Sequence, residues 1–193
     1  FRDKTIVIPG GIDGDISFCA LEPESPLKTI FISGRVDDPV KGLQVVLDAN
    51  TLLRQKRSDF RVVATHFDQR LSEGNFVATG WLSHEEAIRQ VTQADICVVP
   101  SLWREPFGLV ALEAMMAGKP VCASDTGGLR DIVVRGETGY LFPPGDSKML
   151  AGYLEMLLDD AALRTTLGCA GRERARFRFT WENVIKTHYL PLL

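Results

Sequence analysis

Hydrophobic positions recur with two different periods along this chain. Short apolar, β-branched runs predict strands at residues 29–33, 61–65, 75–78, 96–99, 120–123 and 140–142. Between and after them, apolar residues three and four positions apart predict helices at residues 43–55, 84–92, 109–117, 129–133, 146–158 and 161–175. Because strands that alternate with crossover helices pair in parallel, the pattern predicts an α/β fold, a Rossmann-like parallel sheet flanked by helices.

The first residues lie outside this alternation. Residues 1–8 suggest a strand with charged flanks, and they lack the long apolar stretch and the cleavage site of a signal peptide. The chain starts in this strand without an initiator Met, so we expect a fragment of a longer protein. The Pro-Gly-Gly turn at 9–11 and the Pro-rich residues 22–26 interrupt every periodic pattern and predict a linker ahead of the main domain.

Composition narrows the range of partners. The chain has 193 residues, 45% of them apolar, and 22 Lys and Arg stand against 25 Asp and Glu, which gives a net charge of −3. Such a domain has no overall field that attracts nucleic acid, and no apolar run approaches the ~20 residues of a membrane span. The four dispersed cysteines, without a C-x-x-C pair, predict reduced thiols and a cytoplasmic protein rather than disulfides or zinc; they are Cys19, Cys97, Cys122 and Cys169.

The segment after the predicted strand at 96–99 carries the strongest candidate site. Ligands of parallel sheets bind beyond the carboxyl ends of the strands, and here a loop leads into a helix that begins near Gly108. The free N–H groups of such a helix start can bind a phosphate. Glu105 in the loop and Glu113 one turn into the helix could face one cleft and accept hydrogen bonds from sugar hydroxyls. Alternatively, Glu113 only interacts with the helix dipole and Glu105 is a solvated loop residue.

A second candidate is the loop after the strand at 29–33. Arg35 and Lys41 flank a turn made by Asp38 and Pro39, at the same edge of the predicted sheet. Two cations there can neutralise a diphosphate without a metal ion. Two basic residues in a loop are more often simply solvated. Only their location beside the helix start favours the interpretation that they bind a diphosphate.

Other motifs indicate less. The dinucleotide and P-loop fingerprints are both missing, and the three histidines are too far apart in sequence to suggest a metal site. Asp13-Gly14-Asp15 has the D-x-D form that binds metal in some sugar transferases, but a plain turn is favoured. A run of arginines with aromatic neighbours favours a solvated helix face over contact with an anionic membrane; its members are Arg172, Arg174, Arg176 and Arg178.

Four ordered motifs resemble the C-terminal domain of group 1 (family 4-like) glycosyltransferases, which are retaining enzymes of the GT-B fold. They are Gly34-Arg35 to Lys41-Gly42, residues 94–101, Glu105-Pro106-Phe107-Gly108-Leu109 with Glu113-Ala114-Met115, and residues 136–146. The resemblance extends from residues 8–13 to Trp181 and Tyr189. It implies one half of a GT-B architecture, with an interdomain segment at 1–25, a nucleotide-sugar-binding domain at 26–178 and a closing helix at 179–193.

The resemblance also implies roles for particular residues. Arg35 and Lys41, in the loop that starts at Gly34, would hold the diphosphate and offset charge on the leaving group. Glu105 would contact the donor sugar and Glu113 the ribose. The expected catalytic residues are thus Arg35, Lys41 and Glu105. Backbone amides of residues 107–110 would bind sugar hydroxyls and phosphate, and the base would lie near residues 80–82; these positions are Phe107, Gly108, Leu109, Val110, Gly80, Trp81 and Leu82.

The implied reaction is retaining transfer of a hexosyl group from a nucleoside-diphosphate sugar to an acceptor hydroxyl, without a cofactor or metal ion. The leaving nucleoside diphosphate acts as the base, and Glu105 is a sugar ligand rather than a nucleophile. The acceptor belongs to an N-terminal domain that this chain lacks. We therefore expect the chain to bind the donor and to transfer sugar poorly or not at all, with peripheral membrane contact as an option for the full-length protein.

Two functions of other classes compete with this interpretation. A nucleotide-sugar epimerase with the same architecture would keep a phosphate site but would not need the Glu-Pro-Phe-Gly motif, so the spacing of Glu105 and Glu113 counts against it. A non-catalytic nucleotide- or carbohydrate-binding module would have the same sequence features. Turnover of the full-length parent separates these cases.

Overall fold

Six parallel strands form the centre of the molecule. The computed structural model describes residues 6–14 and 26–193, and within them the strands lie in the order β3-β2-β1-β4-β5-β6. β1 pairs with β2 on one side and with β4 on the other, with Ile30 opposite both Val62 and Ile96. All six predicted strands and the Rossmann-like α/β class are confirmed. The strands are β1 (Lys28–Ile32), β2 (Phe60–Ala64), β3 (Phe76–Ala78), β4 (Ile96–Val99), β5 (Val121–Ser124) and β6 (Gly139–Phe142).

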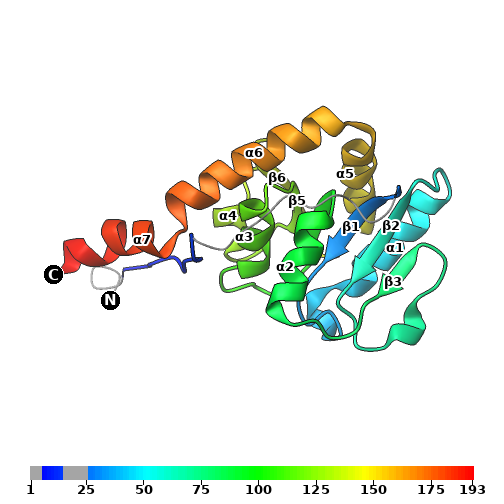
Figure 1. The fold of residues 1–193 in the computed structure, drawn as a ribbon, viewed down its shortest axis with the longest axis horizontal. Coiled ribbons are helices and arrows are strands. Elements are labelled where there is room, and N and C mark those ends of the chain that lie inside the picture. Colours follow the sequence, from blue (N-terminus) through cyan, green and yellow to red (C-terminus); the bar gives the residue numbers. More distant parts are fainter. Residues whose placement is uncertain (1–5, 15–25) are drawn as a thin grey trace.

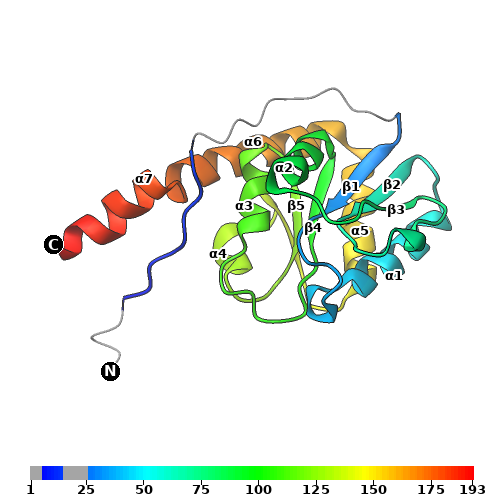
Figure 2. The same ribbon diagram turned by 60° about the horizontal axis from the view of Figure 1, so that its bottom comes forward.

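Helices cover both faces of the sheet, as Figures 1 and 2 show. The predicted helices are all present, and most begin and end within a residue or two of their predicted bounds; the last predicted helix continues to Arg178. They are α1 (Leu43–Arg54), α2 (His84–Gln93), α3 (Leu109–Met116), α4 (Leu129–Ile132), α5 (Ser147–Asp159), α6 (Ala161–Arg178) and α7 (Trp181–Val184). A π-helical turn at Ile185–Tyr189 and a 3-10 turn at Leu190–Leu192 continue α7, and 3-10 turns form at Pro39–Lys41 and Gln69–Leu71.

The alternation of side chains along each strand divides the core into two layers. Ile30 and Ile32 of β1 belong to the layer that α1 and α5 cover, while Phe31 between them belongs to the layer with α3. Apolar side chains dominate both layers, with Leu112 and Met115 of α3 completely buried. The central strands β4 and β5 bury both faces and are near-continuous runs of buried residues, whereas Val77 in the edge strand β3 is exposed.

The strand order places the candidate loops side by side. The chain runs from β1 outward to β2 and β3 and then returns, so β4 pairs with the other edge of β1. The loops that follow β1 and β4 therefore leave the sheet as neighbours in opposite directions, and the crevice between them is where ligands of such sheets bind.

Residues 6–14 run beside the start of α7 (Figures 1 and 2). The backbone N–H of Ile12 donates to the carbonyl of Phe179 at 2.7 Å, and the N–H of Trp181 donates back to Ile12 at 3.1 Å. The strand expected at residues 1–8 is wrong for residues 6–8, which are irregular, and Val7 is 86% exposed. Residues 1–5, Asp15, Cys19 and residues 22–25 of the linker predicted at 22–26 lie outside the described residues.

Candidate functional site

The loop after β1 is built around a capped turn. As the sequence predicts, Asp38 and Pro39 shape it: the Asp38 side chain accepts a hydrogen bond from the N–H of Val40 at 3.1 Å and caps the turn that carries Lys41. Gly42 follows with a φ of 77° and lies directly against the Pro100 carbonyl, so a Cβ there would overlap that oxygen. The loop after β1 is therefore locked against the loop after β4.

Glu105, in the loop after β4, is the most heavily bonded side chain of the site. Lys41 Nζ lies 3.1 Å from its Oε2, Ser101 Oγ donates to the same oxygen at 3.0 Å, and Trp103 Nε1 donates to it at 2.7 Å. Lys41 Nζ also lies 5.0 Å from the centroid of the Trp103 ring, within range of a cation–π interaction. The Glu105 side chain is only 14% exposed, so the solvated loop residue that was the alternative is wrong.

The loop after β5 contacts the backbone of Glu105. The N–H of Gly128, after β5, donates to the Glu105 carbonyl at 2.8 Å. Gly127, with a φ of 51°, approaches that carbonyl so closely that a Cβ would overlap it. Glu105 is thus positioned by the ends of three neighbouring strands.

The start of α3 is open to a ligand. Its N-cap is Gly108, which has a φ of 115° and offers no side-chain cap, and the first N–H groups of Leu109 and Val110 have no acceptor in the described part of the chain. Both residues line a cavity between the loops that follow β1 and β4. These orphan donors and the positive end of the helix favour an anion.

Glu113 has a different environment. Its side chain is 16% exposed, and no donor among residues 6–14 and 26–193 makes a hydrogen bond to it. Burial raises the pKa of this carboxyl, and the only opposing influence is His84 of α2, whose Nδ1 lies 3.7 Å from Oε1. A carboxylate that lacks donors in a hollow is poised to accept them from a ligand.

Two adjoining cavities bring most of the predicted residues together. A cavity of about 500 Å³ lies between the loops after β1 and β4, and a second of about 360 Å³ continues it toward α2. The first is lined by Gly34, Arg35, Lys41, Glu105, Phe107, Gly108, Leu109 and Val110, and the second by Gly34, Arg35, Trp81, Leu82, Leu109, Val110 and Glu113. Gly80 lines neither cavity; its φ is 80° and its N–H donates to the His66 carbonyl at 3.0 Å.

Arg35 and Lys41 differ in how they are held. Lys41 is paired with Glu105, whereas the exposed guanidinium of Arg35 has no ion pair or hydrogen bond within the described residues. The predicted convergence of the two cations on one cavity is confirmed. Sequence reasoning missed Ser101, Trp103 and His84, although a buried Glu105 needs donors and the indole two residues away was a signal for one.

The remaining sequence candidates have plain structural explanations. Among the described residues no group of three or more His, Cys, Asp or Glu could hold a metal ion, and Cys97 and Cys122 are buried free thiols. Burial raises the pKa of Cys97 to about 12. Arg172, Arg176 and Arg178 are exposed, as a solvated helix face requires, while Arg174 is half-buried. In the part of the chain that is described, no helix has the length and apolarity needed to traverse a bilayer.

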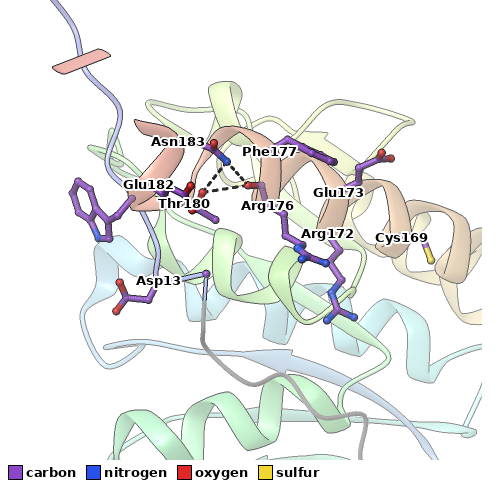
Figure 3. Close-up of a pocket in the computed structure, with 11 residues that line it drawn as sticks. Asp13, Cys169, Arg172, Glu173, Arg176, Phe177, Thr180, Glu182 and Asn183 are labelled. Carbon is purple, nitrogen blue, oxygen red and sulfur yellow. Dashed lines mark hydrogen bonds between the residues drawn. The ribbon is translucent and has the colours of Figure 1, made fainter. Parts of the chain in front are cut away.

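A separate cavity of about 870 Å³ lies where α6 meets α7 (Figure 3). Arg172 and Arg176 reach into it from α6, and the Asn183 amide donates to the Arg176 carbonyl and to Thr180 Oγ1, both at 2.9 Å. Glu173, Glu182 and Asp13 also line this cavity, so its charges are mixed. It does not adjoin the cavity at Glu105.

Comparison with known proteins shows the family to which this chain is similar. A family model described as glycosyl transferases group 1 matches residues 20–174. The chain is 36% identical over 168 residues to a phosphatidyl-myo-inositol mannosyltransferase of Mycobacterium leprae, which covers 81% of this chain and 44% of that protein.

Solved structures agree with the fold. Sucrose-phosphate synthase from Thermosynechococcus elongatus superposes with a TM-score of 0.75 at 30% identity, over 96% of this chain and 52% of that one. The Anabaena protein Alr3699/HepE in complex with UDP and glucose superposes with a TM-score of 0.80 at 22% identity, over all of this chain and 57% of that one. The chain spans about half the length of the curated relatives it matches. Its fold is the expected half of a GT-B architecture.

Proposed function

Because the chain belongs to the glycosyl transferases of group 1, we propose that it is the donor-binding half of a retaining enzyme that transfers a hexosyl group from a nucleoside-diphosphate sugar to an acceptor hydroxyl. One observation carries the proposal: Lys41, Glu105 and the open start of α3 meet in one cavity at the crevice between β1 and β4. Together they supply a cation, a hydroxyl acceptor and free N–H donors, which are the groups that a sugar diphosphate requires.

The diphosphate is held by positive charge from two directions. The guanidinium of Arg35, which has no partner among residues 6–14 and 26–193, and the N–H groups of Leu109 and Val110 are available to it directly. Lys41 is shared between the diphosphate and Glu105 and offsets the charge that develops on the leaving group. With two cations in place, a divalent metal ion is not needed for this step.

The donor sugar binds Glu105 through one carboxylate oxygen. Ser101, Trp103 and Lys41 all approach Oε2, whereas Oε1 has, among the described residues, only Lys41, at 3.4 Å. Oε1 is therefore the atom that accepts a sugar hydroxyl. Glu113 accepts the ribose hydroxyls, and the base lies against Trp81 and Leu82 in the adjoining cavity.

Transfer breaks the bond between the sugar C1 and the diphosphate oxygen and forms a bond from C1 to the acceptor oxygen on the same face. The acceptor hydroxyl gives its proton to the departing diphosphate oxygen. Glu105 orients the sugar and forms no covalent bond with it. The relatives support a hexosyl donor, since one is named a mannosyltransferase and another was solved with UDP and glucose.

The acceptor belongs to the part of the relatives that this chain does not span. The described cavity contains donor-binding groups, and the chain covers 44% of the mycobacterial mannosyltransferase. We expect the 193-residue chain to bind the donor without efficient turnover. A cytoplasmic location, as the free thiols at Cys97 and Cys122 suggest, belongs to the same proposal.

Calorimetric titration with UDP, GDP, ADP and their sugar conjugates tests the donor site. One nucleotide should bind clearly better than the others, and Arg35→Ala should weaken it about tenfold to a hundredfold, the effect of losing a charge-assisted hydrogen bond. Arg70→Ala is the matched control, because the side chain of that arginine is 90% exposed and its one ion pair in the described part of the chain is with Asp68. Equal affinity of both variants, or no binding by the folded chain, would contradict the proposal.

A further inference from the structure

A cavity of about 460 Å³ adjoins the cavity in which the base of the donor is proposed to lie. Arg35 and Trp81 line both, so the two share one wall. The other lining residues belong to the loops that follow β1 and β2; they are Asp37, Asp38 and Phe67. The proposed binding of the diphosphate, the sugar and the ribose uses none of these three residues.

Two large aromatic side chains lie exposed at this cavity. Phe67 is 73% exposed and Trp81 is 66% exposed, although rings of this size usually gain free energy by burial. Two exposed rings at one cavity favour a flat ligand that covers them. A nucleobase is such a ligand, because each base has an aromatic face that stacks on aromatic side chains.

Hydrogen bonds fix the loops that carry both rings. The backbone N–H of Phe67 donates to Asp37 Oδ1 at 2.8 Å and so joins the loop after β2 to the loop after β1. The N–H of Gly80, the residue before Trp81, donates to the His66 carbonyl at 3.0 Å. The backbone next to each ring is therefore held before a ligand arrives, which lowers the entropic cost of binding.

Asp37 presents one free carboxylate oxygen at this cavity. Its Oδ1 accepts the N–H of Phe67, and His66 Nε2 lies 3.3 Å from the same oxygen. The N–H of Asp68 donates to His66 Nδ1 at 3.0 Å, so the hydrogen of the neutral imidazole is on Nε2 and faces Asp37. Both lone pairs of Oδ1 are thus used, whereas Oδ2 has no partner within residues 6–14 and 26–193.

We propose that this cavity makes the donor site selective for guanine. The base stacks on Trp81 and Phe67, and its N1–H and 2-amino group donate to Asp37 Oδ2. The inference rests on the proposed function and deepens it, because it names the nucleotide of the same donor site. Asp38 also lines the cavity, but its Oδ1 accepts the N–H of Val40 and caps the turn that follows.

The chemistry of the base edges carries this choice. Guanine has two neighbouring donors, N1–H and the 2-amino group, and Asp37 Oδ2 has two lone pairs to accept them. Uracil offers one N–H between two carbonyl oxygens, which a carboxylate repels. Adenine offers an amino group next to a ring nitrogen whose lone pair also faces the carboxylate. Asp37 therefore attracts the edge of guanine and repels groups on the other two bases.

Titration of the 193-residue chain with GDP, IDP, ADP, UDP and xanthosine diphosphate tests the inference. GDP should bind most tightly. IDP, which lacks the 2-amino group, should bind about tenfold more weakly, and ADP and UDP should bind at least about tenfold more weakly.

Asp37→Asn should reverse the preference. Because Oδ1 faces two N–H donors, the amide oxygen keeps that position and the NH2 group faces the cavity. The variant should bind GDP about tenfold to a hundredfold more weakly. Xanthosine diphosphate, which has a carbonyl in place of the 2-amino group, should then bind better than GDP because that carbonyl accepts from the new amide.

Two further variants serve as controls. Asp68→Asn removes the same charge two residues from His66, but Asp68 does not line the cavity. It should change the affinity for every nucleotide less than twofold. Phe67→Ala should weaken GDP and UDP alike, about tenfold, because stacking depends little on which base is present.

The pattern of affinities separates this inference from the proposed function. Tighter binding of ADP or UDP than of GDP, or equal losses of GDP affinity in Asp37→Asn and Asp68→Asn, overturns the selectivity for guanine while the donor site stands. The ratio of GDP to IDP affinity in the unchanged chain needs no variant, and a ratio near one also overturns it. Absence of nucleotide binding by the unchanged chain contradicts the donor site instead.

Discussion

Glu105 and Glu113 lie on one loop-and-helix segment and are almost equally buried, at 14% and 16% side-chain exposure, but their surroundings are opposite. Glu105 receives three donors from Lys41, Ser101 and Trp103. Glu113 receives none within the described chain and has only His84 at 3.7 Å. The charge of Glu105 is therefore compensated before any ligand arrives, whereas Glu113 keeps an unsatisfied carboxylate.

This difference separates two ways to build a binding site. The Glu105 region is preorganised: its side chains already hold one another, and a ligand has to share or replace a bond. The Glu113 region stores an unfavourable desolvation, which a ligand with hydroxyl groups relieves. The first arrangement favours precise positioning of the sugar, and the second favours the gain in affinity when the nucleotide binds.

The largest expected effect comes from breaking the backbone contact beneath Lys41. Gly42→Ala places a Cβ on the Pro100 carbonyl at a positive φ, so the two loops must separate, and we expect the free energy of unfolding to fall by about 3 kcal/mol. Gly136→Ala is the control, because Gly136 also has a positive φ, of 75°, but nothing lies within 4 Å of its Cβ position. It should lose only about 1–2 kcal/mol in urea unfolding. Equal losses of unfolding free energy in the two variants would mean that contact between the loops after β1 and β4 does not stabilise the protein.

A double-mutant cycle on Lys41→Met and Glu105→Gln sharpens the first half of the comparison. Because this pair is partly buried and Glu105 is the only carboxylate within ion-pair distance of Lys41 in the described chain, we expect a coupling energy of about 1–2 kcal/mol in the free protein. The exposed pair of Lys56 and Glu155 is the control, with an expected coupling of about 0.5 kcal/mol or less. A Lys41–Glu105 coupling as small as that of the control would show that the site is not preorganised.

The pH dependence of nucleotide binding tests the second half. Since burial raises the pKa of Glu113, its carboxylate takes up a proton above the ordinary glutamate value of 4.5 and loses acceptor capacity there. Nucleotide affinity should therefore fall severalfold as the pH drops toward that value. The effect on folding has the opposite sign: the contribution of Glu113 to stability is full below the ordinary pKa and is lost as the pH rises through the raised one.

Glu113→Gln is the variant that isolates this effect. It should bind the nucleotide more weakly at neutral pH, with the acidic decrease abolished, and should unfold at the same or a slightly higher urea concentration. Glu105→Gln should retain the decrease, since it leaves Glu113 unchanged. An acidic decrease that persists in Glu113→Gln would assign the titration to another group.

The sequence predicts the scaffold of this site better than its details. β4 occupies the predicted residues 96–99, and β1 begins and ends only one residue earlier than predicted. Strands are predicted this closely because runs of buried β-branched residues are local features of the sequence. The convergence of Arg35, Lys41, Glu105 and Glu113 was also predictable, since parallel strands bring their following loops to one edge.

What the sequence could not provide depends on contacts between distant segments. The bonds of Ser101 and Trp103 to Glu105 depend on how the loop folds back, and the approach of His84 to Glu113 depends on packing of α2 near α3. The expected strand at residues 1–8 was wrong at residues 6–8 because β-branched residues form a strand only beside a partner strand, and the described residues offer none there. The arginines of α6 have helix propensity, which extends that helix beyond its predicted end.

The location of a bound donor tests the central claim most directly. In a crystal structure of the chain with the tightest-binding nucleoside-diphosphate sugar, the diphosphate should contact Arg35, Lys41 and the start of α3. The sugar should lie on Glu105, and the ribose should lie within hydrogen-bond distance of Glu113. A nucleotide bound elsewhere, for example in the cavity between α6 and α7, with the bonds of Glu105 unchanged and Glu113 without a donor, would contradict the account.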